Sequence, residues 1–292
     1  MINYCIQPDI TFLSTTYTRF NYLSNSQKIL CDSPIIAIYN RLVAMTEKTK
    51  EYKFVLLGEG GQGKTTAMNI LQAELLYQNI PHYFYKSSEI NSNDIDEIEK
   101  ISEEYLIIID AWDELSKDFK EELLDILGKK SKLIISSRYK PTDFESWTNL
   151  FEAEIQPISK EQIKHLLGEE IEEDSRFFEL MTNTMFLLTY MNAESEKKSQ
   201  LRIAQNKASF INENLSSLVT SKNDDLNPNI LFEKIGEYIV KEKQKNKYRE
   251  RLNIPSSLKY IVNQTKDEDG TMKIVTSHAL YSEFLQAYYI KN

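Results

Sequence analysis

The chain has 292 residues, of which 41% are hydrophobic and 27% are charged, and its formal net charge is −9 at pH 7. This length is enough to bury a sizeable core in more than one domain, and the acidic balance argues against nucleic-acid binding over the whole chain. No apolar run approaches the roughly 20 residues that span a bilayer, and the N-terminus lacks the basic start and apolar core of a signal peptide.

Residues 1–50 are expected to form an N-terminal approach segment. Residues 33–49 carry apolar side chains at helical spacing, with Ser33 as the N-cap and Pro34 at the first helical position. Cys5 and Cys31 show no metal-ligand spacing, so we expect reduced thiols. These features together predict a cytoplasmic protein with no membrane partner.

Residues 51–157 are expected to form one α/β domain. The predicted strands and helices alternate along it, with strands at 52–57, 82–88, 105–111, 132–138 and 151–155 and helices at 65–78 and 116–130. Short, fully apolar strands that alternate with helices are typical of a parallel sheet covered on both faces.

The remainder is predicted to form a helical domain, residues 158–226, and a winged-helix domain, residues 227–292. In the first, a capping box at Ser159 opens a helix, and further helices are expected at 175–183, 184–191 and 201–215. In the second, helices are expected on either side of two short strands, which meet at the turn 267–270.

A Gly-rich motif follows the first predicted strand of the α/β domain. It reads GEGGQGKTT and comprises Gly58, Glu59, Gly60, Gly61, Gln62, Gly63, Lys64, Thr65 and Thr66. The pattern G-x-x-x-x-G-K-[ST] between a strand and a helix is that of a P-loop, in which backbone N–H groups and the helix N-terminus surround a phosphate. Lys64 can then reach the β- and γ-phosphates, and the Thr65 hydroxyl can ligate Mg²⁺. The alternative is a glycine turn with an incidental lysine.

Three carboxylates follow the third predicted strand of this domain. Asp110 ends the apolar run LIII, at the sheet edge where a P-loop lies, and can hold hydrated Mg²⁺. Asp113 and Glu114 come in the next turn and can orient or deprotonate an attacking water. The alternative is a solvated helix start, because Asp and Glu are favoured there.

The next predicted strand ends in Arg138, on the same edge of the sheet. An arginine there can sense the γ-phosphate and stabilise charge as the bond breaks, and Ser136 and Ser137 can add hydroxyl contacts. A solvated arginine at a strand end is the alternative.

Together these motifs resemble the NACHT branch of the STAND signal-transducing NTPases. Small Ala111 directly after Asp110 is the distinguishing feature of that branch. The segment SHALYSEFLQAYYI is similar to the signature that closes its winged helix, matched by His278, Glu283, Phe284 and Ala287. The predicted fold class is therefore α/β: a P-loop NTPase parallel sheet core of the AAA+/STAND type, followed by the helical and winged-helix domains.

The resemblance implies a nucleotide-operated switch. In relatives, the residue matched by His278 contacts the β-phosphate of ADP and holds a closed resting state; a histidine that caps or packs on the last helix is the alternative. Implied ligands are ATP, ADP and Mg²⁺, with slow hydrolysis and self-association into an oligomer in the ATP state. Relatives also carry an effector and a sensor, so we expect these on separate partners or elsewhere in a longer protein, in bacterial anti-phage defence.

Two other functions stay open from the sequence. An AAA+-like motor or remodelling enzyme uses the same P-loop, although motors place glutamate directly after the residue matched by Asp110. A module that binds ATP without cleaving it is the other. The basic residues between Lys241 and Arg251 can touch nucleic acid, but a solvated helix end is the favoured interpretation, so nucleic acid is not expected as a partner.

Overall fold

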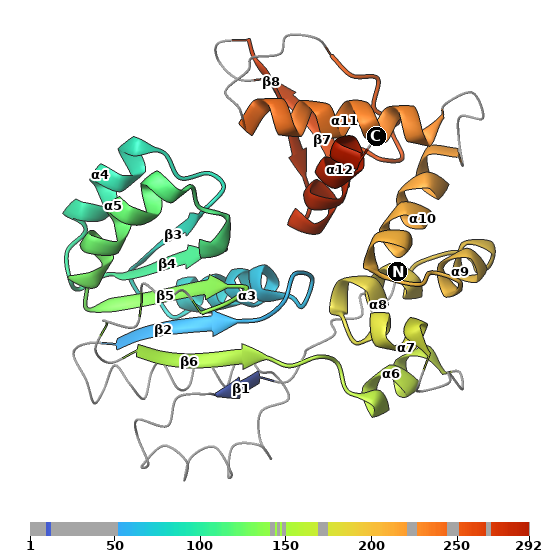
Figure 1. Ribbon diagram of the computed structural model, residues 1–292. Helices are drawn as coiled ribbons and strands as arrows, with labels where there is room; N and C mark the ends of the chain where they lie inside the picture. The colour runs from blue at the N-terminus through green and yellow to red at the C-terminus, as the bar shows by residue number, and fades with distance from the viewer. Residues whose placement is uncertain are drawn as a thin grey trace. The chain divides into compact units, whose positions relative to one another are not determined.

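The computed structural model describes residues 10–12, 52–140, 144, 147, 150–168, 175–220, 227–243, 251–266 and 270–291 (Figure 1). The helix predicted at 33–49, Cys5 and Cys31 lie outside these residues. The chain divides into two compact units, Met1–Ile158 and Ser159–Asn292. The further boundary expected between residues 226 and 227 stays a prediction.

A six-stranded sheet in the order β1-β6-β2-β5-β4-β3 forms the first unit. Its strands are β1 (Ile10–Phe12), β2 (Tyr52–Leu57), β3 (His82–Lys86), β4 (Leu106–Asp110), β5 (Lys132–Ser137) and β6 (Leu150–Ile155). Strands β2 to β6 run parallel, and β1 pairs antiparallel with β6. The predicted α/β fold with a parallel sheet is confirmed; the pairing of β1 was not predicted.

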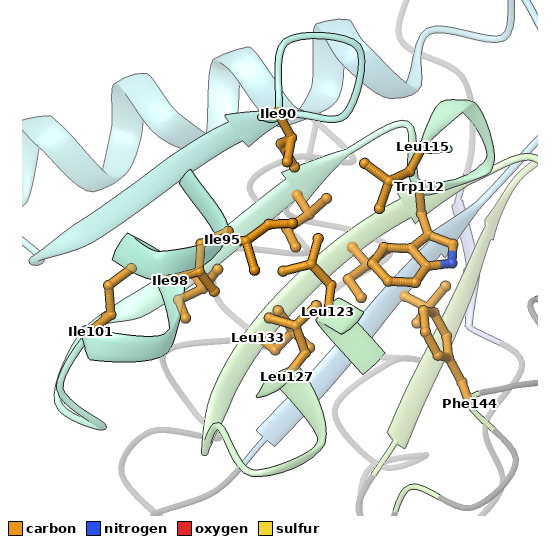
Figure 2. Close-up of a cluster of buried hydrophobic side chains, with 14 of the residues drawn as sticks. Ile90, Ile95, Ile98, Ile101, Trp112, Leu115, Leu123, Leu127, Leu133 and Phe144 are labelled. Carbon is orange, nitrogen blue, oxygen red and sulfur yellow. The ribbon is translucent and has the colours of Figure 1, made fainter. Parts of the chain in front are cut away.

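Helices cover both faces of this sheet. On one face, α3 (Lys64–Tyr77) packs its buried side chains against Phe54 and Leu56. On the other face, α4 (Ser92–Lys100) and α5 (Lys117–Gly128) enclose a second cluster, which includes Val55, Leu57 and the side chains drawn in Figure 2. Because successive strand residues point to opposite faces, an unbroken apolar run supplies both clusters.

Helix α4 was not predicted from the sequence. Asn91 caps its N-terminus: its side chain accepts a hydrogen bond from Asn93 N–H at 2.9 Å, and its own N–H donates to Asp94 Oδ2 at 2.8 Å. Ile95 and Ile98 are buried beneath it. A parallel connection from β3 to β4 needs a crossover of this kind, so the capping box and the isoleucine spacing were the signals for it.

The second unit contains seven described helices and one hairpin. The helices are α6 (Lys160–Leu167), α7 (Arg176–Met181), α8 (Thr184–Met191), α9 (Ser195–Arg202), α10 (Lys207–Thr220), α11 (Pro228–Lys243) and α12 (Ala279–Lys291). Strands β7 (Val262–Lys266) and β8 (Met272–Thr276) pair antiparallel, which confirms the predicted hairpin, while residues 267–269 of its turn lie outside the described ranges. No helix in the described part of the chain is long and apolar enough to cross a membrane.

The helix predicted at 201–215 is confirmed over residues 207–215, which lie in α10, but residues 203–206 form a break and α9 is a separate helix that was not predicted. The break follows from a local capping arrangement. Asn206 Oδ1 accepts from Ser209 N–H at 2.9 Å, and Ser209 Oγ accepts from Gln205 and Asn206 N–H at 2.9 and 3.1 Å. Polar side chains that satisfy backbone groups in this way begin a new helix instead of continuing the old one.

Helices α11 and α12 cross closely. A Cβ atom on Gly236 of α11 would lie 2.1 Å from the backbone oxygen of Leu285 in α12. Phe232 packs edge-on against Phe284 and Tyr288 of the facing helix, with ring centroids 6.3 and 5.8 Å apart. Glycine at this crossing therefore lets the two backbones approach.

Candidate functional site

The Gly-rich motif forms the loop between β2 and α3. Gly61 and Gly63 have φ of 87° and 98°, in the left-handed region that favours glycine. Ala67 N–H donates to Gly63 O at 2.9 Å, which is the first backbone hydrogen bond of the helix. The N–H groups of residues 64–66 therefore have no acceptor within the helix. These groups stand at the positive end of α3, where an anion is stabilised.

Contacts within the loop fix its start. Glu59 N–H donates to Gln62 Oε1 at 2.6 Å, and Gly58 N–H donates to Ser137 O of β5 at 3.2 Å. A Cβ on Gly58 would lie 2.9 Å from that same Gln62 oxygen and 3.3 Å from Ile155 Cβ. Gln62, which the motif leaves unspecified, therefore helps to shape the loop, and Gly58 makes room for it.

Lys64 is buried at the first position of α3. Its Nζ donates to Gly58 O at 2.5 Å and to Glu59 O at 3.0 Å. Burial lowers the pKa of Lys64, and the carboxylate of Asp113 opposes this effect. The charges of Arg138, Asp110 and Glu114 also act on this pKa, in that order of size, so the structure brings these predicted site residues into electrostatic range of Lys64.

Asp110 ends β4 with its side chain almost completely buried. Ser136 of β5 donates its hydroxyl hydrogen to Asp110 Oδ1 at 2.5 Å, and Ser136 Oγ accepts from Ala111 N–H at 2.8 Å. Strands β4 and β5 bring the two together because Ile109 pairs with Ile135. Ser136 therefore orients the predicted metal ligand, whereas Ser137 donates its hydroxyl to Tyr139 O at 2.8 Å.

The left-handed backbone of Ala111, with φ of 61°, turns the chain into a short 3₁₀ helix at Trp112–Glu114. This turn carries both remaining acids toward the end of β5. A small side chain suits the position because this conformation is strained for larger residues.

Arg138 is bonded to the acids of that turn. Its backbone N–H donates to Asp113 Oδ1 at 2.9 Å, and its Nε lies 3.0 Å from Asp113 Oδ2. Its Nη2 lies 3.6 Å from Glu114 Oε1. The Asp113 side chain is 6% exposed and the Glu114 side chain 34%, so Asp113 holds the arginine and Glu114 is the more accessible carboxylate.

The residues suit Mg²⁺ bound chiefly through phosphate. Among the residues that the structure describes, no group of three or more His, Cys, Asp or Glu side chains could hold a metal ion. Asp110 supplies one oriented carboxylate, and Thr65 is exposed in the first turn of α3. Mg²⁺ commonly takes one or two carboxylates together with substrate phosphates and waters, so this sparse set of donors fits it.

His278 lies in the second unit, at the start of α12. Its Nδ1 accepts from Leu280 N–H at 3.1 Å, and its backbone oxygen accepts from Tyr281 N–H at 3.0 Å. Phe284 of the same motif packs on Phe232. The motif therefore has a packing role, and the contact of His278 with a nucleotide stays a prediction.

The sequence matches no protein-family model and no curated protein. Among solved structures, the chain is similar to Thermotoga maritima RuvB, a Holliday junction branch migration motor, at 13% identity and a TM-score of 0.37, over 85% of this chain and 93% of that one. It is also similar to domain III of the Thermotoga maritima replication initiation protein DnaA, at 11% identity and a TM-score of 0.34, over 64% and 85% of the two chains.

Proposed function

We propose that this chain is a NACHT-type signalling switch that binds ATP and ADP with Mg²⁺ and hydrolyses ATP slowly. The observation that carries the proposal is the bonding of Arg138 to Asp113 and Glu114, within electrostatic range of the P-loop residue Lys64. An arginine that is paired with carboxylates beside a phosphate site can exchange these partners for the γ-phosphate, which only ATP carries.

Binding would begin at the P-loop. The N–H groups at the start of α3 would take the β-phosphate, and the Lys64 ammonium, which donates to two loop carbonyls, would gain stronger acceptors in phosphate oxygens. Thr65 and Asp110 would hold Mg²⁺. When bound, the ion would neutralise charge on the β- and γ-phosphates.

Arg138 would distinguish the two nucleotides. The γ-phosphate of ATP would compete with Asp113 and Glu114 for the guanidinium, whereas ADP would leave the ion pair intact. This difference gives each nucleotide its own preferred state, which a switch requires. Once Arg138 moves to phosphate, Glu114 would be available to orient the attacking water, and slow hydrolysis would reset the switch.

The wider proposal follows the family resemblance. His278 would contact the β-phosphate of ADP and hold the resting state, and exchange for ATP would free surfaces for self-association. A separate or additional effector and sensor would complete a cytoplasmic defence system, with phage infection as the proposed setting. The similarity of SHALYSEFLQAYYI to the family signature supports this part.

The test is to identify the nucleotide that co-purifies with the protein and then to measure its mass in solution with ADP and with ATP. We expect retained ADP, poor turnover and larger assemblies with ATP. Asp113→Asn should weaken the hold on Arg138 and assemble more readily, while Lys64→Ala should bind neither nucleotide. Fast steady-state hydrolysis by a monomer would contradict the switch, and turnover that a macromolecular substrate stimulates would indicate an AAA+-like motor instead.

A further inference from the structure

The second unit contains a cavity of about 300 Å³ beside the hairpin. It lies between the segment that leads toward the hairpin and strand β7. Its lining residues are Arg251, Leu252, Asn253, Ile254, Lys259, Asn263 and Gln264. This volume is at the lower end of small-molecule sites, roughly 300–1,000 Å³.

Backbone contacts hold the walls of the cavity in place. Leu252 N–H donates to Gln264 Oε1 at 2.8 Å, which ties the segment to β7. Ile254 N–H donates to Leu252 O at 3.0 Å, and the Ile254 side chain is buried. These contacts fix the backbone of the segment against β7, while the side chains of Arg251, Asn253, Lys259 and Asn263 are exposed to solvent.

The lining is rich in cations and hydrogen-bond donors. It contains Arg251 and Lys259 but no Asp or Glu, and neither cation makes an ion pair or hydrogen bond with another residue that the structure describes. Side-chain amides of Asn253 and Asn263 add further donors. In a chain of net charge −9, residues 241–259 carry seven Lys or Arg and two Glu, so positive charge gathers in this part of the sequence.

We infer that this cavity is a second phosphate-binding site that takes a nucleotide, either free or as one unit of a single-stranded nucleic acid. Arg251 and Lys259 bind the phosphate, as guanidinium and ammonium groups do. The amides at the rim contact the base edge, because amides can both donate and accept there. The inference is independent of the P-loop and revises the expectation that the basic residues near Arg251 are only a solvated helix end.

The test uses the full chain carrying Lys64→Ala, so that the P-loop does not contribute. The probe is a short fluorescein-labelled single-stranded oligonucleotide without a 5′-phosphate, followed by fluorescence anisotropy at several salt concentrations. Arg251→Gln or Lys259→Gln should each weaken binding about tenfold. Each should also reduce the salt slope by about 0.7, the value for one contact on a single strand.

The matched control is Lys266→Gln, which removes the same charge from β7 outside the cavity and should change affinity less than about twofold. Thermal melts check that every variant is folded. Direct titration with a fluorescent AMP analogue separates the two sources: binding of the analogue assigns the pocket to a free nucleotide, and binding of the strand alone assigns it to nucleic acid. If neither probe binds, or if Lys266→Gln weakens binding as much as the pocket variants, the inference is overturned.

Discussion

The carboxylate of Asp110 depends on Ser136 for its orientation, because the serine hydroxyl donates to one carboxylate oxygen and accepts from the next backbone N–H. Removing a group that positions a metal ligand typically reduces metal affinity by about 10–100-fold. We expect Ser136→Ala to raise the Mg²⁺ concentration needed for ATP binding by at least about tenfold, measured by Mg²⁺ titration with a non-hydrolysable analogue.

Ser137→Ala is the matched control for this prediction. Ser137 is equally buried but donates to Tyr139 O and not to Asp110. Its replacement should therefore leave the Mg²⁺ requirement unchanged. Equal effects of the two substitutions would show that a general loss of packing, and not the orientation of Asp110, is responsible.

Tyr85 of β3 should make the free energy of unfolding depend on pH in the alkaline range. Its hydroxyl oxygen is buried and has no hydrogen-bond partner among the described residues. Burial, followed by the charges of Glu97 and Asp94, raises the pKa of Tyr85 to about 12, against about 10 in an unfolded chain. Between these values the unfolded chain loses this proton and the folded chain keeps it, so the free energy of unfolding should fall as pH rises above about 10.

Tyr85→Phe isolates this effect. At neutral pH the change removes a buried hydroxyl without a partner, so stability should be unchanged or should rise by about 1 kcal/mol. Above about pH 10 the variant should lose less stability than the parent. Urea unfolding at pH values around 7, 9 and 11 measures both quantities, and parallel curves for the two proteins would contradict the assignment.

At the scale of elements, the crossing of α11 and α12 depends on Gly236. A Cβ atom there would overlap the backbone oxygen of Leu285 and approach Tyr289 Cβ to 2.8 Å, and backbone cannot move aside as a flexible side chain can. We expect Gly236→Ala to destabilise the second unit by about 1–3 kcal/mol or more, despite the better helix propensity of alanine. Chemical denaturation followed by circular dichroism measures this.

Gly128→Ala at the end of α5 is the control for helix propensity. Its Cβ would meet nothing closer than Trp147 Nε1 at 3.5 Å, an ordinary contact distance. Stability should therefore stay the same or rise by up to about 1 kcal/mol. A loss at Gly128 as large as that at Gly236 would exclude the helix crossing as the cause.

The elements differ in how far the sequence predicts them. Strands such as β4 are unbroken apolar runs, so their existence follows from the residues alone. The order of the strands in the sheet does not follow from the residues alone, because no residue near Ser136 indicates that β5 lies beside β4. The pairing of Arg138 with Asp113 depends on that order and on the turn at Ala111. The P-loop was predictable because its chemistry occupies consecutive residues.

Errors arose where local polar contacts outweigh hydrophobic spacing. The predicted helix at 201–215 begins six residues too early, because Asn206 and Ser209 satisfy backbone groups at a break before α10. Helix α4 was missed because only Ile95 and Ile98 give it an apolar stripe, and its clearest signal is the polar capping box at Asn91. The three-residue strand β1 offers too few residues for any period to appear.

At the scale of the whole molecule, the proposed switch predicts that one ligand stabilises both units. ADP at a concentration of about 100 times its Kd should stabilise the folded state by about 2.7 kcal/mol. If His278 contacts the nucleotide, this stabilisation extends to residues 159–292; with His278→Ala it should be confined to residues 1–158. Hydrogen exchange measured by mass spectrometry follows both units separately.

Tryptophan fluorescence gives an independent reading of the first unit, since the chain's two tryptophans, Trp112 and Trp147, both belong to it. ADP should shift its unfolding transition in the parent and in His278→Ala alike. Protection of the second unit that persists in His278→Ala would contradict the role of this histidine without affecting binding at the P-loop.

The antiparallel pairing of β1 with β6 bears on how recombinant fragments should be designed. Residues 10–12 pair with Ala153–Ile155 of β6, which would otherwise be the outermost strand on that side of the sheet. A fragment that starts at β2 would lack β1, and the backbone N–H and C=O groups on that edge of β6 would be open to pairing with another chain. Such a fragment should precipitate or form mixed oligomers, and its assemblies would be mistaken for nucleotide-driven ones.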